Sequence, residues 1–428
     1  MIHYTTKDLL YDNSFYNTSF FQIFLKADYK PDLSQMTKSD LGTFVHEYVH
    51  YLQNICTPWG LYSSLIRYKA VAAIIQQLKE ASEIKLPFQP TYDEHLQNEI
   101  NIMMVGEGTC KFDDYYGKQL DTTKKVKLIP DPINYNGRTI DRVALEIFFT
   151  NGECHKIFLG AKIIKESMAS LYQCLFDSNA MSRHDVPYNL VRILFEQCCP
   201  NISHDIKKII TICQLSLYSM RPAEVLLDRM DYANKNPNLS SMDLVEEFIN
   251  NHPISRPSAG EMGIPEFFDN MIDSFSNILK SLTGTEIPFM SGIFDNAKLK
   301  NGYIPVLNIL YGHDNPMSVE YIKSLTDYMG VPYLTTDRGQ TVWGTLIEDE
   351  AIGNMPNDIA ALRAITLIVD YLTIRHRTTY CLAFKHECDG RAKQDYECLD
   401  SPWKGEECPF TQILETFGID KNKIAGWE

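Results

Sequence analysis

The segment "FVHEYVHYLQ", Phe44 to Gln53, sets two histidines four residues apart, with a glutamate directly after the first. Because an α-helix turns by about 100° per residue, His46 and His50 lie within about 40° of each other on one helical face and can point at one ion. Glu47 lies about 100° around from His46, beside the pair. The segment therefore predicts a helix with two metal ligands and an adjacent carboxylate.

The helix that carries these residues is predicted over positions 37–56, where "TKSDLGTFVHEYVHYLQNIC" offers Thr37 or Ser39 as the N-cap. One side of it has the broad apolar stripe that packs into a core. The stripe consists of Leu41, Phe44, Val45, Tyr48, Val49, Leu52 and Ile55. The histidine face instead carries Gly42, a small residue that leaves room, and Gln53, whose amide can support a histidine ligand.

The chemistry of these residue types favours zinc. Neutral imidazoles bind Zn²⁺ well, and the ion polarises a carbonyl and lowers the pKa of a water molecule towards neutrality. A carboxylate beside the ligands can take the proton of that water and return it to a leaving amine. Chance would produce H-E-x-x-H on the order of once in a hundred chains of this length. A zinc hydrolase site is therefore favoured over two unrelated surface histidines.

The segment "TFVHEYVHYLQ" resembles the active-site helix of the zincin metallopeptidases. The glycine and the histidine of the metzincin extension would fall at Gln53 and Cys56, so that subclass is excluded. The chain is more similar to gluzincins, whose third zinc ligand is a glutamate on a later helix. The resemblance implies an α+β fold with a zincin-like catalytic domain, in which a small twisted sheet accompanies an active-site helix and a third-ligand helix.

The best match to the third ligand is Glu166 in "GAKIIKESMASL", since a Gly-led helix with a glutamate followed by small residues resembles the gluzincin third-ligand helix. Glu166 lies about 160–200° from the apolar stripe of its own helix. That stripe consists of Ile164, Met168, Leu171 and Leu175. Such a position is also typical of an ordinary solvated glutamate, and Glu107 in "VGEGT" and Glu80 in "QLKEASE" are alternative ligands. Ser170 stands where gluzincins have an aspartate and is, with Gln53, a candidate to orient the histidines.

Two segments are candidates for the sheet edge to which a zincin adds an extended substrate. "SFFQIFLKA", positions 19–27, has strand-like composition and precedes the active-site helix, although a core strand is an equal alternative. The second is "HKIFLG", positions 155–160. It belongs to a predicted hairpin in which Asn151-Gly152 forms the turn between 138–149 and 154–160.

Stabilising the transition state of hydrolysis requires a hydrogen-bond donor across the cleft. Residue type alone selects the candidates, and it does not choose among them. They are His155, Tyr218, Arg221, His376 and Tyr380.

The 428 residues are too many for one ordinary core. A second helix is predicted over 61–82, an irregular stretch over 86–127, and mostly helices beyond Asp177. The Asn/Pro/Ser-rich interval 234–258 is the candidate linker. We therefore expect a metallopeptidase domain over 1–233, with a long insertion near 86–160, and a mainly helical C-terminal domain over 259–428.

The C-terminal domain ends in a cysteine-rich segment. Its candidate ligands are Cys381, His386, Cys388, Cys398 and Cys408. The intervals between these cysteines are longer than those of zinc knuckles, so ordinary reduced thiols are favoured over a second metal site. An odd total of 11 cysteines in a chain without a secretory leader also favours reduced thiols. The adjacent Cys198 and Cys199 are interpreted as packing residues.

The overall charge and hydropathy limit the partners. With 40 basic and 55 acidic side chains the net charge is −15, which disfavours a nucleic-acid partner, because such binding neutralises backbone phosphates. The longest apolar stretch, 360–374, is too short for a membrane span and contains Arg363 and Asp370, so a buried helix is expected there. The N-terminus does not have the pattern of a secretory signal, and a cytoplasmic location is expected.

Together these features predict a cytoplasmic zinc metallopeptidase that acts on peptides or proteins. His46, His50 and Glu166 would hold one zinc ion, and Glu47 would be the general base. The substrate class follows from the zincin resemblance. The alternative is a non-catalytic regulatory or binding protein that contains zinc in a zincin-like fold.

Overall fold

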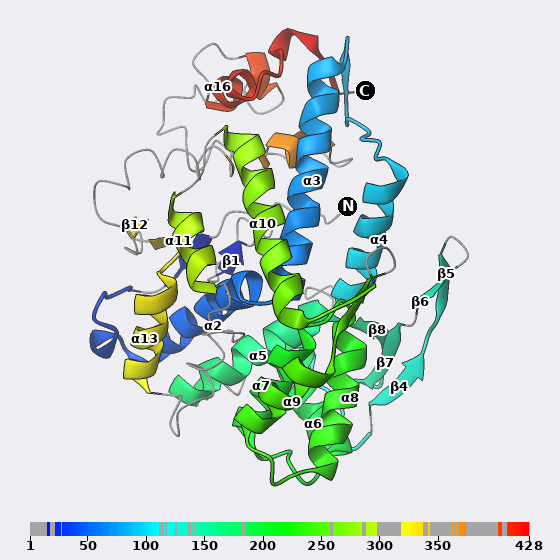
Figure 1. Cartoon of the computed structure of the whole chain (residues 1–428), viewed down its shortest axis with the longest axis vertical. Coiled ribbons are helices and arrows are strands. Elements are labelled where there is room, and N and C mark those ends of the chain that lie inside the picture. Colours follow the sequence, from blue (N-terminus) through cyan, green and yellow to red (C-terminus); the bar gives the residue numbers. More distant parts are fainter. Residues whose placement is uncertain are drawn as a thin grey trace.

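The chain forms an α+β fold that is mostly helical and has several small sheets (Figure 1). The computed structural model describes residues 15–17, 22–26, 28–110, 115, 118–124, 126–135, 138–140, 142–177, 179–180, 185–256, 260–284, 288–297, 318–336, 341–342, 362, 365–366, 368–373, 401–404 and 409–427. No helix within these ranges has the length and hydropathy needed to cross a membrane. The α+β class agrees with the expectation from the sequence.

The α-helices are α2 (Lys38–Ile55), α3 (Pro58–Glu80), α4 (Glu94–Glu107), α5 (Ala161–Phe176), α6 (Leu190–Cys198), α7 (Ile206–Ser216), α8 (Pro222–Lys235), α9 (Ser241–Asn251), α10 (Ile264–Thr283), α11 (Pro288–Ala297), α13 (Val319–Met329) and α16 (Pro409–Thr416). Shorter helical turns are η1 (Leu33–Gln35), η4 (Asp185–Asn189), η6 (Pro402–Lys404) and η7 (Lys421–Lys423). The strands are β1 (Phe15–Asn17), β2 (Gln22–Leu25), β3 (Ile84–Leu86), β4 (Lys127–Pro130), β5 (Ile133–Tyr135), β6 (Arg138–Ile140), β7 (Val143–Phe148), β8 (Cys154–Leu159), β9 (Ile254–Arg256), β10 (Gly260–Met262), β11 (Tyr333–Thr336), β12 (Thr341–Val342) and β13 (Ile424–Trp427).

Helix α2 begins where the sequence predicts. Thr37 is the N-cap, and its hydroxyl accepts a hydrogen bond from the backbone N–H of Asp40. All residues of the predicted apolar stripe are buried. Helix α5 packs against the histidine face, where His46 is buried and His50 is partly buried. A Cβ atom added to Gly42 would lie 3.1 Å from the Cβ of Asp177, so this glycine allows close packing of α5 and does not leave open space.

Helix α5 follows the predicted hairpin directly. Strands β7 and β8 pair antiparallel, and Gly152 in the turn between them has φ of 88°. Gly42 near the start of α2 meets Asp177 just beyond the end of α5, whereas Gln53 near the end of α2 reaches Lys165 near the start of α5. The two helices therefore run antiparallel, and the face of α5 that carries Glu166 lies towards α2.

Strand β2 lies inside a sheet with the strand order β1-β2-β11-β12. It pairs antiparallel with β1 and parallel with β11, so it cannot accept a substrate strand. Its Ile23 and Leu25 are fully buried. The edge-strand hypothesis for "SFFQIFLKA" is therefore wrong, and the core alternative holds. Strand β8 does lie at the edge of the β4-β7-β8 sheet, where Thr109 forms an isolated bridge with Phe158.

The interval predicted as a linker contains helix α9. Ser240 and Asp243 form a capping box, and Leu244, Val245 and Phe248 are buried in the main core. This core holds residues from both sides of the interval and does not divide there. The hydroxyl of Tyr48 on α2 donates to the backbone carbonyl of Gly330, just beyond α13, which joins the C-terminal part to α2.

Two further segments were assigned from their composition, one of them wrongly and the other correctly. The stretch predicted to be irregular contains α4, which is capped by Asp93 and buries Leu96, Ile100 and Met103. Residues 368–373 of the apolar stretch are helical, as expected, and Leu372 lies in a second hydrophobic cluster with the end of α3, β3 and β13. Figure 1 shows α3 and α10 packed side by side along the length of the molecule.

Candidate metal centre

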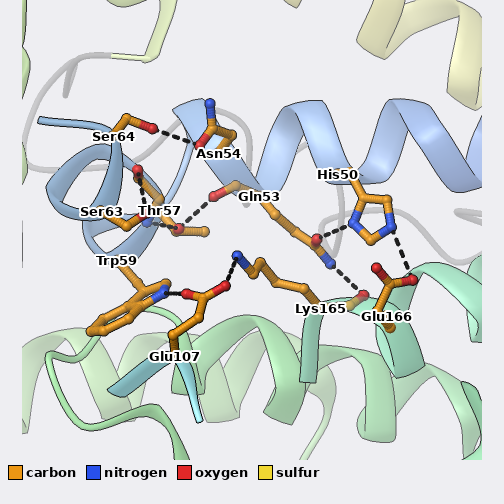
Figure 2. A network of polar contacts seen from close by, with 11 residues as sticks. His50, Gln53, Asn54, Thr57, Trp59, Ser63, Ser64, Glu107, Lys165 and Glu166 are labelled. Carbon is orange, nitrogen blue, oxygen red and sulfur yellow. Dashed lines mark hydrogen bonds and ion pairs between the residues drawn. The ribbon is translucent and has the colours of Figure 1, made fainter. Parts of the chain in front are cut away.

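Helices α2 and α5 bring His46, His50 and Glu166 together. The Nε2 atoms of the two histidines lie 3.3 Å apart. A carboxylate oxygen of Glu166 lies 3.5 Å from Nε2 of His46. The same oxygen lies 3.4 Å from Nε2 of His50, the contact drawn in Figure 2. The side chains are 6%, 13% and 21% exposed, in the order His46, His50 and Glu166. These atoms form a nearly equilateral triangle in a largely buried position.

The dimensions of this triangle fit one zinc ion. Zinc binds imidazole nitrogen and carboxylate oxygen at about 2.0–2.1 Å in tetrahedral geometry, so neighbouring ligand atoms lie about 3.3–3.4 Å apart. The measured separations of 3.3, 3.5 and 3.4 Å agree with this value. Two imidazoles and a carboxylate are also a donor set typical of zinc. The residues present therefore fit the metal that the zincin resemblance implies.

The alternative third ligands lie elsewhere. The carboxylate of Glu107 binds the ammonium of Lys165 at 3.0 Å and accepts a hydrogen bond from the indole N–H of Trp59 at 3.1 Å. Glu80 is exposed at the end of α3, where it accepts a hydrogen bond from Gln76. Of the three glutamates considered from the sequence, the structure brings Glu166 to the histidines.

The electrostatics of the triangle favour an ionised carboxylate. Burial alone would raise the pKa of Glu166, but the charges and hydrogen bonds of His50 and His46 hold that pKa well below its usual value. Burial alone would lower the pKa of His50, but the facing Glu166 carboxylate raises it. The site thus attracts positive charge, and a proton and a metal ion compete for the same histidine nitrogens.

Gln53 orients His50. Its side-chain oxygen lies 2.9 Å from Nδ1 of His50, and its NH₂ group donates to the backbone carbonyl of Lys165 at 3.1 Å (Figure 2). With its NH₂ group used in this way, Gln53 accepts through its side-chain oxygen a hydrogen bond from Nδ1–H of neutral His50. The lone pair of His50 is then on Nε2, the atom that faces Glu166. The predicted supporting role of Gln53 agrees with this geometry.

Ser170 is the other predicted support of the histidines, and Glu47 is the predicted general base. Ser170 is buried on α5, but among the described contacts its hydroxyl forms no hydrogen bond with His46 or His50. The orienting role of Ser170 therefore stays a prediction. Glu47 is buried on α2, and its negative charge contributes to the raised pKa of His50. Its carboxylate is thus within electrostatic range of the ligands without belonging to the triangle.

The sequence candidates for a transition-state donor do not gather at the triangle. Tyr218 is fully buried and donates to the carbonyl of Cys56 at 2.6 Å, and Arg221 is exposed and pairs with Glu224. His155 on β8 contacts Glu153. None of these described contacts involves the triangle, so the donor role of Tyr218, Arg221 and His155 stays a prediction. His376 and Tyr380 lie outside the described residues.

One aromatic residue at the site was missed from the sequence. The ring of Tyr188 lies edge-on to the ring of His46, with 5.9 Å between their centroids. Tyr188 belongs to η4, which packs against α5. The segment "DVPYN" that forms η4 has no periodicity or motif that points to a site. Only the packing of η4 on α5 brings this tyrosine to the histidines.

The second predicted metal site is not among the described residues, because Cys381, His386, Cys388, Cys398 and Cys408 all lie outside them. The described cysteines are free thiols. Cys199 is buried, as its interpretation as a packing residue requires, whereas Cys198 is exposed.

Within the described part of the chain, the residues His46, His50 and Glu166 form the one group of three histidine, cysteine or acidic side chains with the spacing of a metal site. No protein-family model, curated protein or solved structure matches this chain. A function must therefore be inferred from the chemistry of this group and its surroundings.

Proposed function

We propose that this protein is a zinc-dependent metallopeptidase of the gluzincin type. The observation that supports it best is the triangle of His46, His50 and Glu166, whose atoms are 3.3–3.5 Å apart although Glu166 comes from a different helix. Glu47 adds a buried carboxylate directly beside the first ligand. Peptide-bond hydrolysis is the reaction that the zincin resemblance implies.

In this proposal His46, His50 and Glu166 hold the ion. Bound zinc supplies a Lewis acid that polarises the scissile carbonyl and makes water acidic near neutral pH. Glu47 accepts the proton of the attacking water and returns it to the nitrogen of the leaving amine. Gln53 keeps the Nδ1 proton of His50 in place, so that the ligand nitrogen Nε2 stays unprotonated.

The number of ligands favours catalysis over a structural role. A structural zinc is normally enclosed by four protein ligands, whereas a catalytic zinc keeps one position open. The described group supplies three ligands, and the acid next to them is the residue type that a general base requires. A non-catalytic zinc protein would have no need of Glu47.

Metal removal tests the proposal. The purified full-length protein is incubated with a mixed peptide library, and new termini are identified by mass spectrometry. Cleavage is expected, with loss of activity after stripping with a chelator and recovery after adding about one equivalent of Zn²⁺ per chain. Zinc bound tightly without any cleavage would favour the non-catalytic alternative. Cleavage that survives complete zinc removal would contradict the proposal.

We further propose that the hydroxyl of Tyr188 donates a hydrogen bond to the developing oxyanion, because the ring of Tyr188 contacts the ring of His46. Tyr188→Phe is then expected to lower kcat by about 10²-fold with little change in zinc affinity, as for loss of an oxyanion donor. Tyr232→Phe on α8 is the control, since Tyr232 instead packs against Arg229. Unchanged kcat in Tyr188→Phe would show that this ring only packs against the ligand.

A further inference from the structure

We infer that Glu107 is a positioning residue for the candidate metal centre: it holds the ammonium of Lys165 away from the carboxylate of the neighbouring Glu166. The inference rests on the proposed function, since it assumes that Glu166 binds zinc. It assigns a role to the buried ion pair Glu107–Lys165, which lies beside the ligands and takes no part in the chemistry proposed for them (Figure 2).

The backbone around Glu107 is built for close approach. A Cβ atom on Gly106 would collide with the ring of Trp59, and one on Gly160 would lie 2.5 Å from the carbonyl carbon of Glu107. Gly108 has φ of 74°, a conformation that favours glycine, and ends α4 at this point. The segment "VGEGT" thus passes tightly between Trp59 and the start of α5. This path brings the Glu107 side chain against the beginning of α5, where it contacts Lys165.

The contacts of Glu107 lead to both helices of the metal centre. One carboxylate oxygen binds the Lys165 ammonium at 3.0 Å, and the other accepts from the indole of Trp59 at 3.1 Å. The backbone carbonyl of Lys165 accepts from Gln53, which in turn contacts His50. The backbone of Lys165 is therefore tied to Gln53, which contacts His50, and its ammonium is held by Glu107.

The ammonium of Lys165 needs a fixed partner because it is a largely buried positive charge. Lys165 and Glu107 are only 15% and 14% exposed, so an unpaired ammonium here would be poorly solvated and would seek an anion. Side chains of adjacent helical residues diverge by about 100°, and the Lys165 ammonium points away from Glu166 in the structure. The lysine side chain is long and flexible, so an ammonium that Glu107 no longer holds can turn towards the Glu166 carboxylate. Without Glu107, Lys165 would neutralise Glu166 and compete with a cation for it. Arg67 on α3 also acts on Glu107 through its charge, so the acid faces more than one cation.

The test measures zinc affinity of the stripped full-length protein by competition with a chromophoric chelator, together with the visible spectrum of the Co²⁺-loaded protein. Glu107→Gln is expected to weaken zinc binding by about 10- to 100-fold, as for residues that support metal ligands. Lys165→Met and the double variant Glu107→Gln/Lys165→Met remove the competing ammonium. Both are expected to stay within about threefold of the wild type, so that the second substitution rescues the first.

The matched control is Glu99→Gln, which removes the acidic partner of Lys69. This ion pair also starts from α4 but joins it to α3. The zinc affinity of Glu99→Gln is expected to equal that of the wild type. Thermal unfolding of each metal-free variant reports whether it folds. If Glu107→Gln does not fold, Glu107→Asp withdraws the carboxylate from Lys165 with its charge retained, and at least about threefold weaker zinc binding is expected.

Two results would overturn the inference. One is a zinc affinity of folded Glu107→Gln, or of Glu107→Asp in its place, equal to that of the wild type. The other is an equal loss in Glu107→Gln and Lys165→Met, because a pair that only packs α4 on α5 would be weakened from either side. A wild-type protein that binds no zinc would instead refute the proposed function. Zinc binding and cleavage by the wild type, without any effect of Glu107→Gln, would refute the inference alone.

Discussion

Glu47→Gln is expected to lower kcat for peptide hydrolysis by about 10²- to 10⁴-fold, the range for loss of a positioned general base. The amide has the shape of the carboxylate but cannot accept a proton from water. Glu47 is outside the triangle of candidate ligands, so zinc content is expected to stay at about one ion per chain. Turnover on a cleaved library peptide and zinc by mass spectrometry give the two quantities for the same preparation.

The control for Glu47→Gln is Asp40→Asn, which makes the same chemical change on the same helix. Asp40 is partly exposed in the first turn of α2, where its carboxylate accepts a hydrogen bond from the Thr37 hydroxyl. Its kcat is expected to match that of the wild type. If Glu47→Gln kept full activity, Glu47 would not be the base. If it lost zinc together with activity, the carboxylate would have to be a ligand or a structural support.

Glu166→Ala is expected to weaken zinc binding by about 10²- to 10³-fold. Structural zinc sites bind with about 10–16 kcal/mol over four ligands, so one ligand corresponds to about 2.5–4 kcal/mol. The variant also leaves two buried histidines without the carboxylate that faces them at 3.4–3.5 Å. Zinc affinity by chelator competition measures the effect, and activity is expected to fall in parallel at limiting zinc.

Glu196→Ala is the control for Glu166→Ala, because Glu196 is an exposed helical glutamate that pairs only locally with Arg192 on α6. Its zinc affinity is expected to be that of the wild type. Undiminished zinc binding in Glu166→Ala would remove this residue from the site. It would also remove the main support for the gluzincin assignment, because no other described acid lies with His46 and His50.

Local signals in the sequence were sufficient for the two helices of the site. The Thr37 cap and the apolar stripe predict α2, and the position of Glu166 opposite a second stripe predicts a polar face on α5. The turn at Gly152 predicts the hairpin that leads into α5. Each of these features depends on residues only a few positions apart, where periodicity and capping are informative.

The failures concern contacts between distant segments. The pairing of β2 with β11 joins segments about 310 residues apart in the sequence, such as Gln22 and Tyr333, and nothing in "SFFQIFLKA" indicates it. The Asn, Pro and Ser residues before α9 looked like a linker, but Ser240 caps that helix. Gly42 was expected to leave open space beside the histidines, but it allows α5 to pack closely against α2. Tyr188 and Glu107 reach the site through packing, which periodicity does not report.

The central claim is that one zinc ion is bound by His46, His50 and Glu166. X-ray absorption at the zinc edge, on wild-type protein loaded with about one equivalent of metal, tests it most directly. The account predicts nitrogen and oxygen ligands at about 2.0–2.1 Å with the multiple scattering of two imidazoles, and loss of this signal in Glu166→Ala. A shell of sulfur at about 2.3 Å would contradict it, because cysteines would then hold the zinc.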